Sequence, residues 1–138
     1  MKKKLTHRIE DYLEMIFILS KEGISPRITD LADRMKVRKS SIVSAVKKLE
    51  KCGYVQHEPY GAINLTEEGV KRASEVYRKH VILKTFFLEI LCLPEEIAEK
   101  DACNFEHYIS DQTVKELIKL AEKLQKEKKI ENSKKIIF

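Results

Sequence analysis

The sequence lacks any apolar run long enough to cross a bilayer. Its most apolar stretch, from Val81 to Leu93, is interrupted by Lys84 and Glu89, whereas a membrane-spanning helix needs about 20 apolar residues. No apolar signal segment follows the basic start of the chain. We therefore expect a soluble protein that has no membrane partner and resides in the cytoplasm.

Cysteine is also scarce, because the 138 residues contain only Cys52, Cys92 and Cys103. Their odd number and wide spacing do not fit a disulfide framework, so we expect reduced thiols. The length suits one compact domain, or two small ones that share a core. Lysine and arginine total 27 against 22 aspartates and glutamates, for a formal charge of +5. This mild basic excess suits an anionic partner but decides little alone.

Between residues 28 and 53 the sequence predicts two helices joined by a tight turn. The first has apolar residues at helical spacing from Ile28 to Met35, and the second from Ile42 to Leu49, with Ser40 or Ser41 as its N-cap and Gly53 after its end. This is the helix-turn-helix pattern. The second helix suits a DNA major groove. A plain helical hairpin with a solvated basic face is the alternative.

Eight residues are the candidate DNA contacts. Serines would meet base edges and basic side chains would neutralise phosphates. The base contacts are Ser40, Ser41 and Ser44, the phosphate contacts are Arg38, Lys39, Lys47 and Lys48, and Tyr60 is expected at the tip of a wing. The wing is predicted because residues 54–58 and 62–65 alternate apolar and polar side chains around the turn at 59–61. A hairpin after a recognition helix favours DNA binding over a plain helical hairpin.

Metal-binding side chains are concentrated between residues 103 and 107. Residues i, i+3 and i+4 of a helix share a face, so Cys103, Glu106 and His107 would present a thiolate, a carboxylate and an imidazole to one point. Such mixed donors suit a divalent transition ion rather than calcium or magnesium. The alternative is a small buried cysteine beside a solvated Glu-His pair, and the motif alone leaves both open.

Other predicted helices could complete the site. Asp11 and Glu14 lie three residues apart in a helix capped by Thr6, and could instead form an ordinary acidic face. His80 lies midway along a helix, capped by Thr66, that is expected to run from Glu67 toward Leu91. Pro94 opens the helix that carries residues 103–107, and Ser110 caps the last helix. The apolar stripe of that last helix, from Val114 to Leu124, is typical of packing within the chain or across a dimer.

Four short sequence motifs in these regions together resemble a known family. They are Glu10-Asp11-Tyr12-Leu13-Glu14, Leu65-Thr66-Glu67-Glu68-Gly69, Arg78-Lys79-His80 and Cys103-Asn104-Phe105-Glu106-His107-Tyr108-Ile109-Ser110. With the winged helix-turn-helix, they resemble the diphtheria-toxin-repressor family of metal-dependent transcriptional regulators, specifically its short manganese-transport-regulator branch. The resemblance covers nearly the whole chain. It implies a mainly α-helical fold, with a winged helix-turn-helix DNA-binding domain over 1–72 and a helical metal-binding and dimerisation domain over 73–138.

The resemblance also implies a function: a metal-activated repressor of metal-homeostasis genes that binds a palindromic operator on double-stranded DNA as a homodimer. Its metal ligands would be Asp11, Glu14, His80, Cys103, Glu106 and His107. An aspartate at position 11 is typical of the manganese branch and a cysteine at 103 of the iron branch. We favour Mn²⁺, with Fe²⁺ as the alternative, because carboxylates are hard donors. Lys84 and Glu99 replace a carboxylate and a histidine of the iron branch, which argues against an iron-type second site.

Two other functions are open. A winged-helix regulator could respond to redox state through Cys103 or Cys92, or to a small molecule; its DNA binding would then survive a chelator. A hydrolytic enzyme built on the same ligands is disfavoured, because no further nucleophile or general base recurs beside them. We therefore expect a regulator and not an enzyme.

Overall fold

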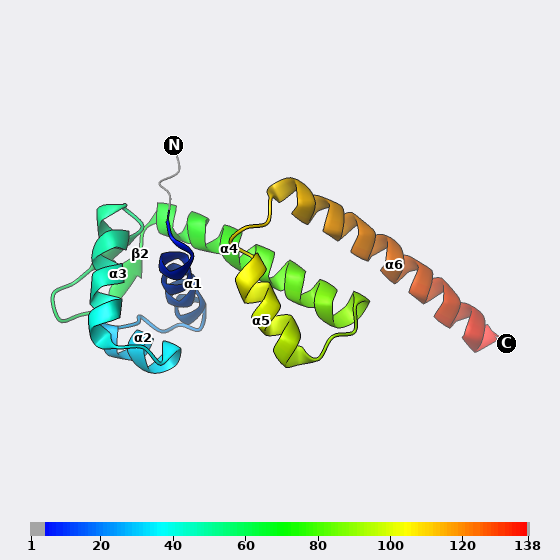
Figure 1. The fold of residues 1–138 in the computed structure, drawn as a ribbon, viewed down its shortest axis with the longest axis horizontal. Coiled ribbons are helices and arrows are strands. Elements are labelled where there is room, and N and C mark those ends of the chain that lie inside the picture. Colours follow the sequence, from blue (N-terminus) through cyan, green and yellow to red (C-terminus); the bar gives the residue numbers. More distant parts are fainter. Residues whose placement is uncertain (1–4, 138) are drawn as a thin grey trace. The chain divides into compact units, whose positions relative to one another are not determined.

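The computed structural model describes the backbone of residues 5–137 and the side-chain environments of residues 5–128. The chain is mainly helical, as predicted, with one small two-stranded sheet. Figure 1 traces its elements in order: α1 (His7–Lys21), α2 (Ile28–Met35), α3 (Lys39–Lys51), β1 (Val55–His57), β2 (Ile63–Leu65), α4 (Glu67–Thr85), η1 (Phe86–Ile90), α5 (Glu95–Phe105) and α6 (Asp111–Ile137). It divides into two compact units, the first ending at Tyr77 and the second starting at Arg78, so that α4 contributes to both.

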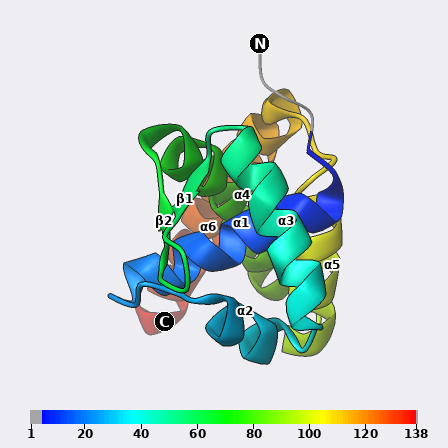
Figure 2. The same ribbon diagram turned by 90° about the vertical axis from the view of Figure 1, so that its left-hand side faces the viewer.

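The first unit is built around one hydrophobic core. Helices α1, α2 and α3 each place an apolar stripe inside it, and the antiparallel pair β1–β2 closes it, with Val55 opposite Leu65. In Figure 2, α3 lies in front of α1 and the two strands lie to one side. The largest fully buried members are Leu13, Ile16, Leu31, Ile42, Leu49, Val55 and Ile63. The helical and alternating spacings seen in the sequence therefore mark the residues that form the core.

Three of the predicted helix caps are confirmed. The side-chain oxygens of Thr6, Thr66 and Ser110 accept hydrogen bonds from backbone amides three residues ahead, at 3.3, 3.1 and 3.2 Å. Each satisfies an amide that has no partner inside its helix.

The predicted cap of α3 is wrong. The N-cap is Arg38, whose extended backbone lets its carbonyl oxygen accept from the amides of Ser41 (3.1 Å) and Ile42 (3.3 Å). The helix therefore begins at Lys39, and Ser40 and Ser41 lie inside its first turn rather than before it.

Glycines shape the passage from α3 to α4. Gly53 follows the end of α3 with a φ of +81°, a left-handed conformation that glycine adopts without strain. At Gly69, an added Cβ would overlap the carbonyl oxygen of Tyr54. That same oxygen accepts the amide of Thr66 at 3.0 Å, so the first turn of α4 lies directly against the chain that leaves α3.

The long helix after the wing is not α-helical throughout. It was expected to run toward Leu91, but α4 ends at Thr85 and η1 continues as a π-helical turn. The amide of Leu91 accordingly donates to the carbonyl of Phe86 at 3.2 Å, one residue farther back than in an α-helix. η1 packs between α5 and α6, with the ring centroid of Phe87 6.3 Å from that of Phe105.

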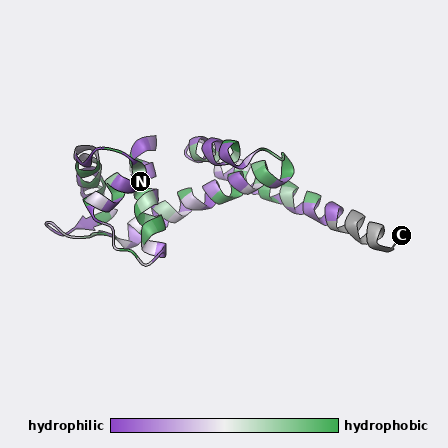
Figure 3. Ribbon diagram, turned by 90° about the horizontal axis from the view of Figure 1, so that it is seen from below, coloured by the Kyte–Doolittle hydropathy of each residue, from purple (hydrophilic) through white to green (hydrophobic). Residues whose placement is uncertain are grey.

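The last helix is longer than its apolar stripe. The stripe ends at Leu124, whereas α6 continues to Ile137. Figure 3 shows hydrophobic and hydrophilic residues mixed along the coloured part of α6. Within residues 5–137, no helix has both the length and the apolar character that crossing a membrane requires.

Candidate metal centre and DNA-binding surface

The imidazole of His80, on α4, lies between two carboxylates of the second unit. Its Nδ1 is 2.7 Å from Oε2 of Glu106, and its Nε2 is 3.2 Å from both carboxylate oxygens of Glu99. The His80 side chain is 11% exposed and that of Glu106 is fully buried. A buried carboxylate needs a cation or hydrogen-bond donors. Here the imidazole of His80 is such a partner for the carboxylate of Glu106.

Cys103 and His107 join the same cluster. The Cys103 Sγ is 3.7 Å from Nδ1 of His80, and Nε2 of His107 is 3.2 Å from Oε1 of Glu106. The prediction that residues 103–107 share a helix is only partly right, because α5 ends at Phe105. Glu106 is its C-cap and keeps a helical backbone, so it still turns toward the face that carries Cys103.

This cluster has the electrostatics of a cation site. Hydrogen bonds with Cys103 and Glu106 raise the pKa of His80 to about 11, against the opposing effect of burial. Burial raises the pKa of Glu106, but hydrogen bonds with His107 and His80 outweigh it and hold that pKa below its usual value. These two partners of His80 therefore favour the protonated ring. A divalent ion could bind there in place of the proton. The nitrogen, oxygen and sulfur donors of His80, Glu99 and Cys103 lie within 4.8 Å of one another, and such a mixed donor set fits a transition metal.

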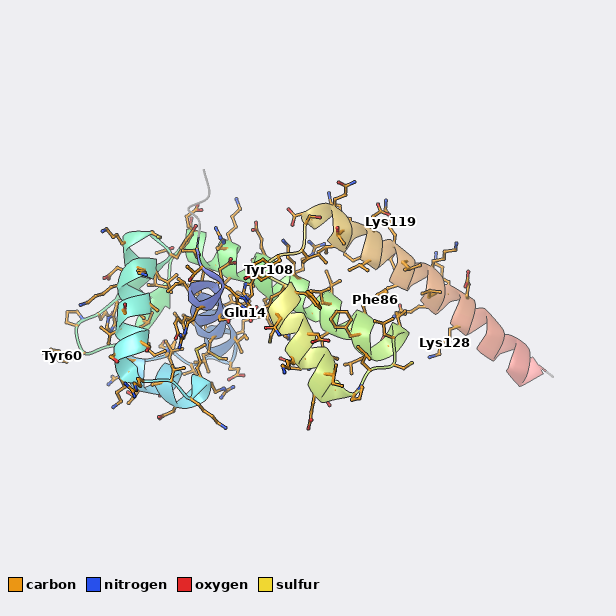
Figure 4. The ribbon with its side chains drawn as sticks, in the orientation of Figure 1. Glu14, Tyr60, Phe86, Tyr108, Lys119 and Lys128 are labelled. Carbon is orange, nitrogen blue, oxygen red and sulfur yellow. The ribbon has the colours of Figure 1, made fainter. Side chains whose placement is uncertain are left out.

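Four of the six predicted ligands thus meet in one unit. The other two, Asp11 and Glu14, lie on α1 in the first unit, and Glu14 is labelled in Figure 4. Within that unit, an Asp11 oxygen is 3.5 Å from Nε2 of His7, and Glu14 is buried at 8% exposure. Their role as ligands remains a prediction.

Two residues of the cluster, Glu99 and Lys84, were predicted only as departures from an iron-type second site and not as members of the metal cluster. Glu99 contacts His80, and its carboxylate also lies 2.9 Å from Nζ of Lys84. The sequence spacing could have indicated Glu99, because it precedes Cys103 by four residues and therefore shares its helix face. Proximity of Lys84 to Glu99 could not be found this way, since these residues belong to different helices.

The predicted DNA contacts lie on the surface of the first unit. Along α3, most exposed residues are basic or hydroxyl-bearing, although Val43 and Glu50 are also exposed. Lys39, Ser40, Ser44, Lys47 and Lys48 are exposed, as is the N-cap Arg38, whereas Ser41 is half-buried. Tyr60 is fully exposed in the loop between β1 and β2, at the position that Figure 4 labels.

A further basic residue borders this surface. Arg8 of α1 lines an open depression together with Ser40, Ser41 and Ser44, and its Nε donates to the Tyr12 hydroxyl at 3.1 Å. The sequence prediction did not include Arg8, because only the packing of α1 beside α3 brings it there.

Comparisons with known proteins identify the domains that carry the metal cluster and the DNA-binding surface. Residues 4–63 match the model of the iron-dependent repressor N-terminal DNA-binding domain, and residues 66–133 match that of the iron-dependent repressor metal-binding and dimerisation domain. The chain belongs to the iron-dependent repressor family. The resemblance to metal-dependent regulators is therefore confirmed, as are the regulatory function and the expectation that this repressor is not an enzyme.

Curated relatives agree with this membership. The repressor is 38% identical over 122 residues to an uncharacterised helix-turn-helix transcriptional regulator of Methanocaldococcus jannaschii, covering 88% of this chain and 98% of the relative. It is 30% identical over 133 residues to the transcriptional regulator MntR of Lysinibacillus sphaericus, covering 94% and 95%.

Solved structures support the same fold. The manganese regulator SloR matches with a TM-score of 0.76 and 30% identity over 86% of this repressor. A manganese-dependent transcriptional repressor in complex with manganese matches with a TM-score of 0.68 and 28% identity over 79%. The repressor spans 55% and 50% of the lengths of these two chains. The predicted winged helix-turn-helix followed by a helical metal-binding and dimerisation domain is confirmed.

Proposed function

We propose that this repressor controls genes of metal homeostasis, that a divalent transition ion activates it, and that Mn²⁺ is favoured over Fe²⁺. The observation that supports it best is the convergence of His80, Cys103, Glu106 and His107 in the metal-binding unit. Asp11 and Glu14 would add two hard oxygen donors, which suit Mn²⁺, while the Cys103 sulfur is the one soft donor and suits Fe²⁺.

For DNA, we propose that two copies of the recognition helix α3 bind a palindromic operator. One recognition helix covers only a few base pairs, so a twofold dimer would place two helices in successive major-groove faces about 34 Å apart, or a multiple of that. The base contacts would come from the three serines of α3, the phosphate contacts from its basic residues, and a further contact from Tyr60 on the wing.

The proposed DNA-binding domain extends over residues 1–72 and the proposed metal-binding and dimerisation domain over residues 73–138. The repressor would act in the cytoplasm.

Activation requires the metal to bind the DNA-competent arrangement of the protein more tightly than the arrangement that does not bind DNA. A ligand with equal affinity for both arrangements would shift nothing. Ligands on both α1 and the second unit would supply this difference, because only an arrangement that brings them together satisfies the ion.

The test is an operator gel shift with the full chain in Mn²⁺, Fe²⁺, Zn²⁺ or chelator. We expect a complex only with metal, and strongest activation by Mn²⁺ at matched free concentrations. Glu106→Gln should abolish the response to every metal, because it removes the charge of the buried carboxylate. Glu96→Gln is the matched control, since it removes the same charge from an exposed position of α5. Equal DNA binding in metal and chelator would refute metal activation. Sensitivity to oxidant instead would favour the redox regulator, and sensitivity to an added small molecule would favour a small-molecule regulator.

A further inference from the structure

The two ring nitrogens of His80 face different groups. Nδ1 lies beside Glu106 and Cys103, which are both proposed metal ligands, at 2.7 and 3.7 Å. Nε2 points the other way, to Glu99 at 3.2 Å. An imidazole that binds a metal through one nitrogen usually donates its other N–H to a carboxylate, a carbonyl or water, and that partner fixes the tautomer and orientation of the ring. Glu99 lies where such a partner would be.

The carboxylate of Glu99 is itself held in place. The Glu99 side chain is 45% exposed, so water could compete for it, but Nζ of Lys84 lies 2.9 Å from its Oε2. Lys84 also lies 3.7 Å from a carboxylate oxygen of Glu95. Lys84 follows His80 by one helical turn on α4, while Glu99 and Glu95 lie one turn apart on α5. The Lys84–Glu99 pair therefore joins the two helices beside the histidine.

We propose that Glu99 and Lys84 are positioning residues of the metal centre. Glu99 accepts the Nε2–H of His80, and Lys84 holds the Glu99 carboxylate where it can do so, which presents Nδ1 to the ion. The inference rests on the proposed metal site and adds two residues to it. Neither residue binds the ion in this arrangement.

The competing role for Glu99 is direct ligation, because its Oε1 also lies 3.7 Å from the Cys103 Sγ. The two roles respond differently to Glu99→Gln. A glutamine keeps an oxygen that can accept the Nε2–H, so positioning would survive. A neutral amide is a much poorer metal ligand than a carboxylate, so direct ligation would not.

The probe is Co²⁺, whose visible absorption reports its ligand set. Affinity would be measured on the full chain by competition with a chromophoric chelator for the parent, Glu99→Gln, Glu99→Ala and the control Glu96→Ala. We expect Glu99→Ala to weaken Co²⁺ binding about 10- to 100-fold and Glu99→Gln to weaken it far less, with the bands of the parent retained in Glu99→Gln. Thermal unfolding of the metal-free variants checks that each folds.

The outcomes separate the two levels of inference. If the parent does not bind Co²⁺, the proposed metal site fails and this inference fails with it. If the parent binds and Glu99→Ala binds equally well, only the positioning role is overturned. Equal losses in Glu99→Gln and Glu99→Ala, with altered absorption bands, would show that Glu99 is a ligand and would also overturn it.

Lys84 is tested by a double-mutant cycle, because removing its charge alone changes the local field. If Lys84 acts by holding Glu99, the effect of Lys84→Met on Co²⁺ affinity should differ by about threefold or more between the parent and the Glu99→Ala background. Equal effects in both backgrounds would show that Lys84 does not act through Glu99, and would refute its positioning role.

Discussion

Metal binding should release a proton from His80 at neutral and mildly alkaline pH. Hydrogen bonds with Cys103 and Glu106 raise its pKa to about 11 from an ordinary value of 6.5. The ring is therefore protonated in the metal-free protein throughout pH 7 to 9, and an ion that binds to it must displace that proton. A histidine of ordinary pKa would be mostly neutral at pH 7 and almost entirely so at pH 9, and would add little pH dependence.

The size of the effect follows from this displacement. One proton exchanged for each ion changes the apparent affinity about tenfold per pH unit, so His80 alone should strengthen binding about a hundredfold between pH 7 and pH 9. Because the predicted slope stays the same for any His80 pKa well above 9, it does not depend on the exact value.

NMR titration of the metal-free protein isolates the contribution of His80. The chain has four histidines, and the ring signals of His80 are those lost in His80→Gln. We expect these signals to remain those of an imidazolium up to pH 9, and calorimetry in two buffers of different ionisation enthalpy to show at least one proton released per ion at pH 8. A His80 transition near pH 6.5 would refute the reasoning. The raised folded-state pKa also means that His80 stabilises the metal-free fold fully below pH 6.5 and progressively less as pH rises toward 11.

Three other predictions concern separate parts of the molecule. Lys39→Ala and Lys48→Ala should each weaken operator binding and lower its salt slope by about one; unchanged slopes in both would show that the recognition helix is misassigned. Cys103→Glu should retain Mn²⁺-activated DNA binding and lose relative affinity for Fe²⁺ and Zn²⁺, while Cys103→Ser should weaken all three; superimposable titrations would mean that Cys103 only packs. Gly69→Ala should lower the free energy of unfolding in urea by about 1–3 kcal/mol, because the new Cβ overlaps the Tyr54 carbonyl; parental stability would contradict that close approach.

Local chemistry was the most predictable part of the fold. Caps at Thr6, Thr66 and Ser110 could be predicted because a short hydroxyl side chain before an apolar periodic run has one favourable use. The cap of α3 was not predictable by the same rule, because two serines follow Arg38 and the backbone of Arg38 already satisfies the first amides. The change to a π-helical turn at Phe86 has no signal in the apolar spacing, and the turn packs against α5 and α6, which lie later in the chain.

The metal cluster was likewise predictable only in part from the sequence. Cys103, Glu106 and His107 are near neighbours in the chain, so their spacing alone indicated a shared site. The residue pattern made His80 only a candidate to complete the site, and the family resemblance named it as a ligand. Contacts such as Lys84 to Glu99 depend on how α4 and α5 pack, and no spacing along one helix contains that distance.

The shared helix α4 affects how the protein can be divided experimentally. Ala73 is buried in the core of the first unit, and Tyr77 packs against that core, although both lie beyond the predicted domain boundary at residue 72. A fragment that ends at 72 would expose this core along one side, whereas one that ends after Tyr77 would keep both side chains. Fragments for DNA-binding measurements should therefore extend past Tyr77, far enough for the last turn of the shortened helix to fray without uncovering the core.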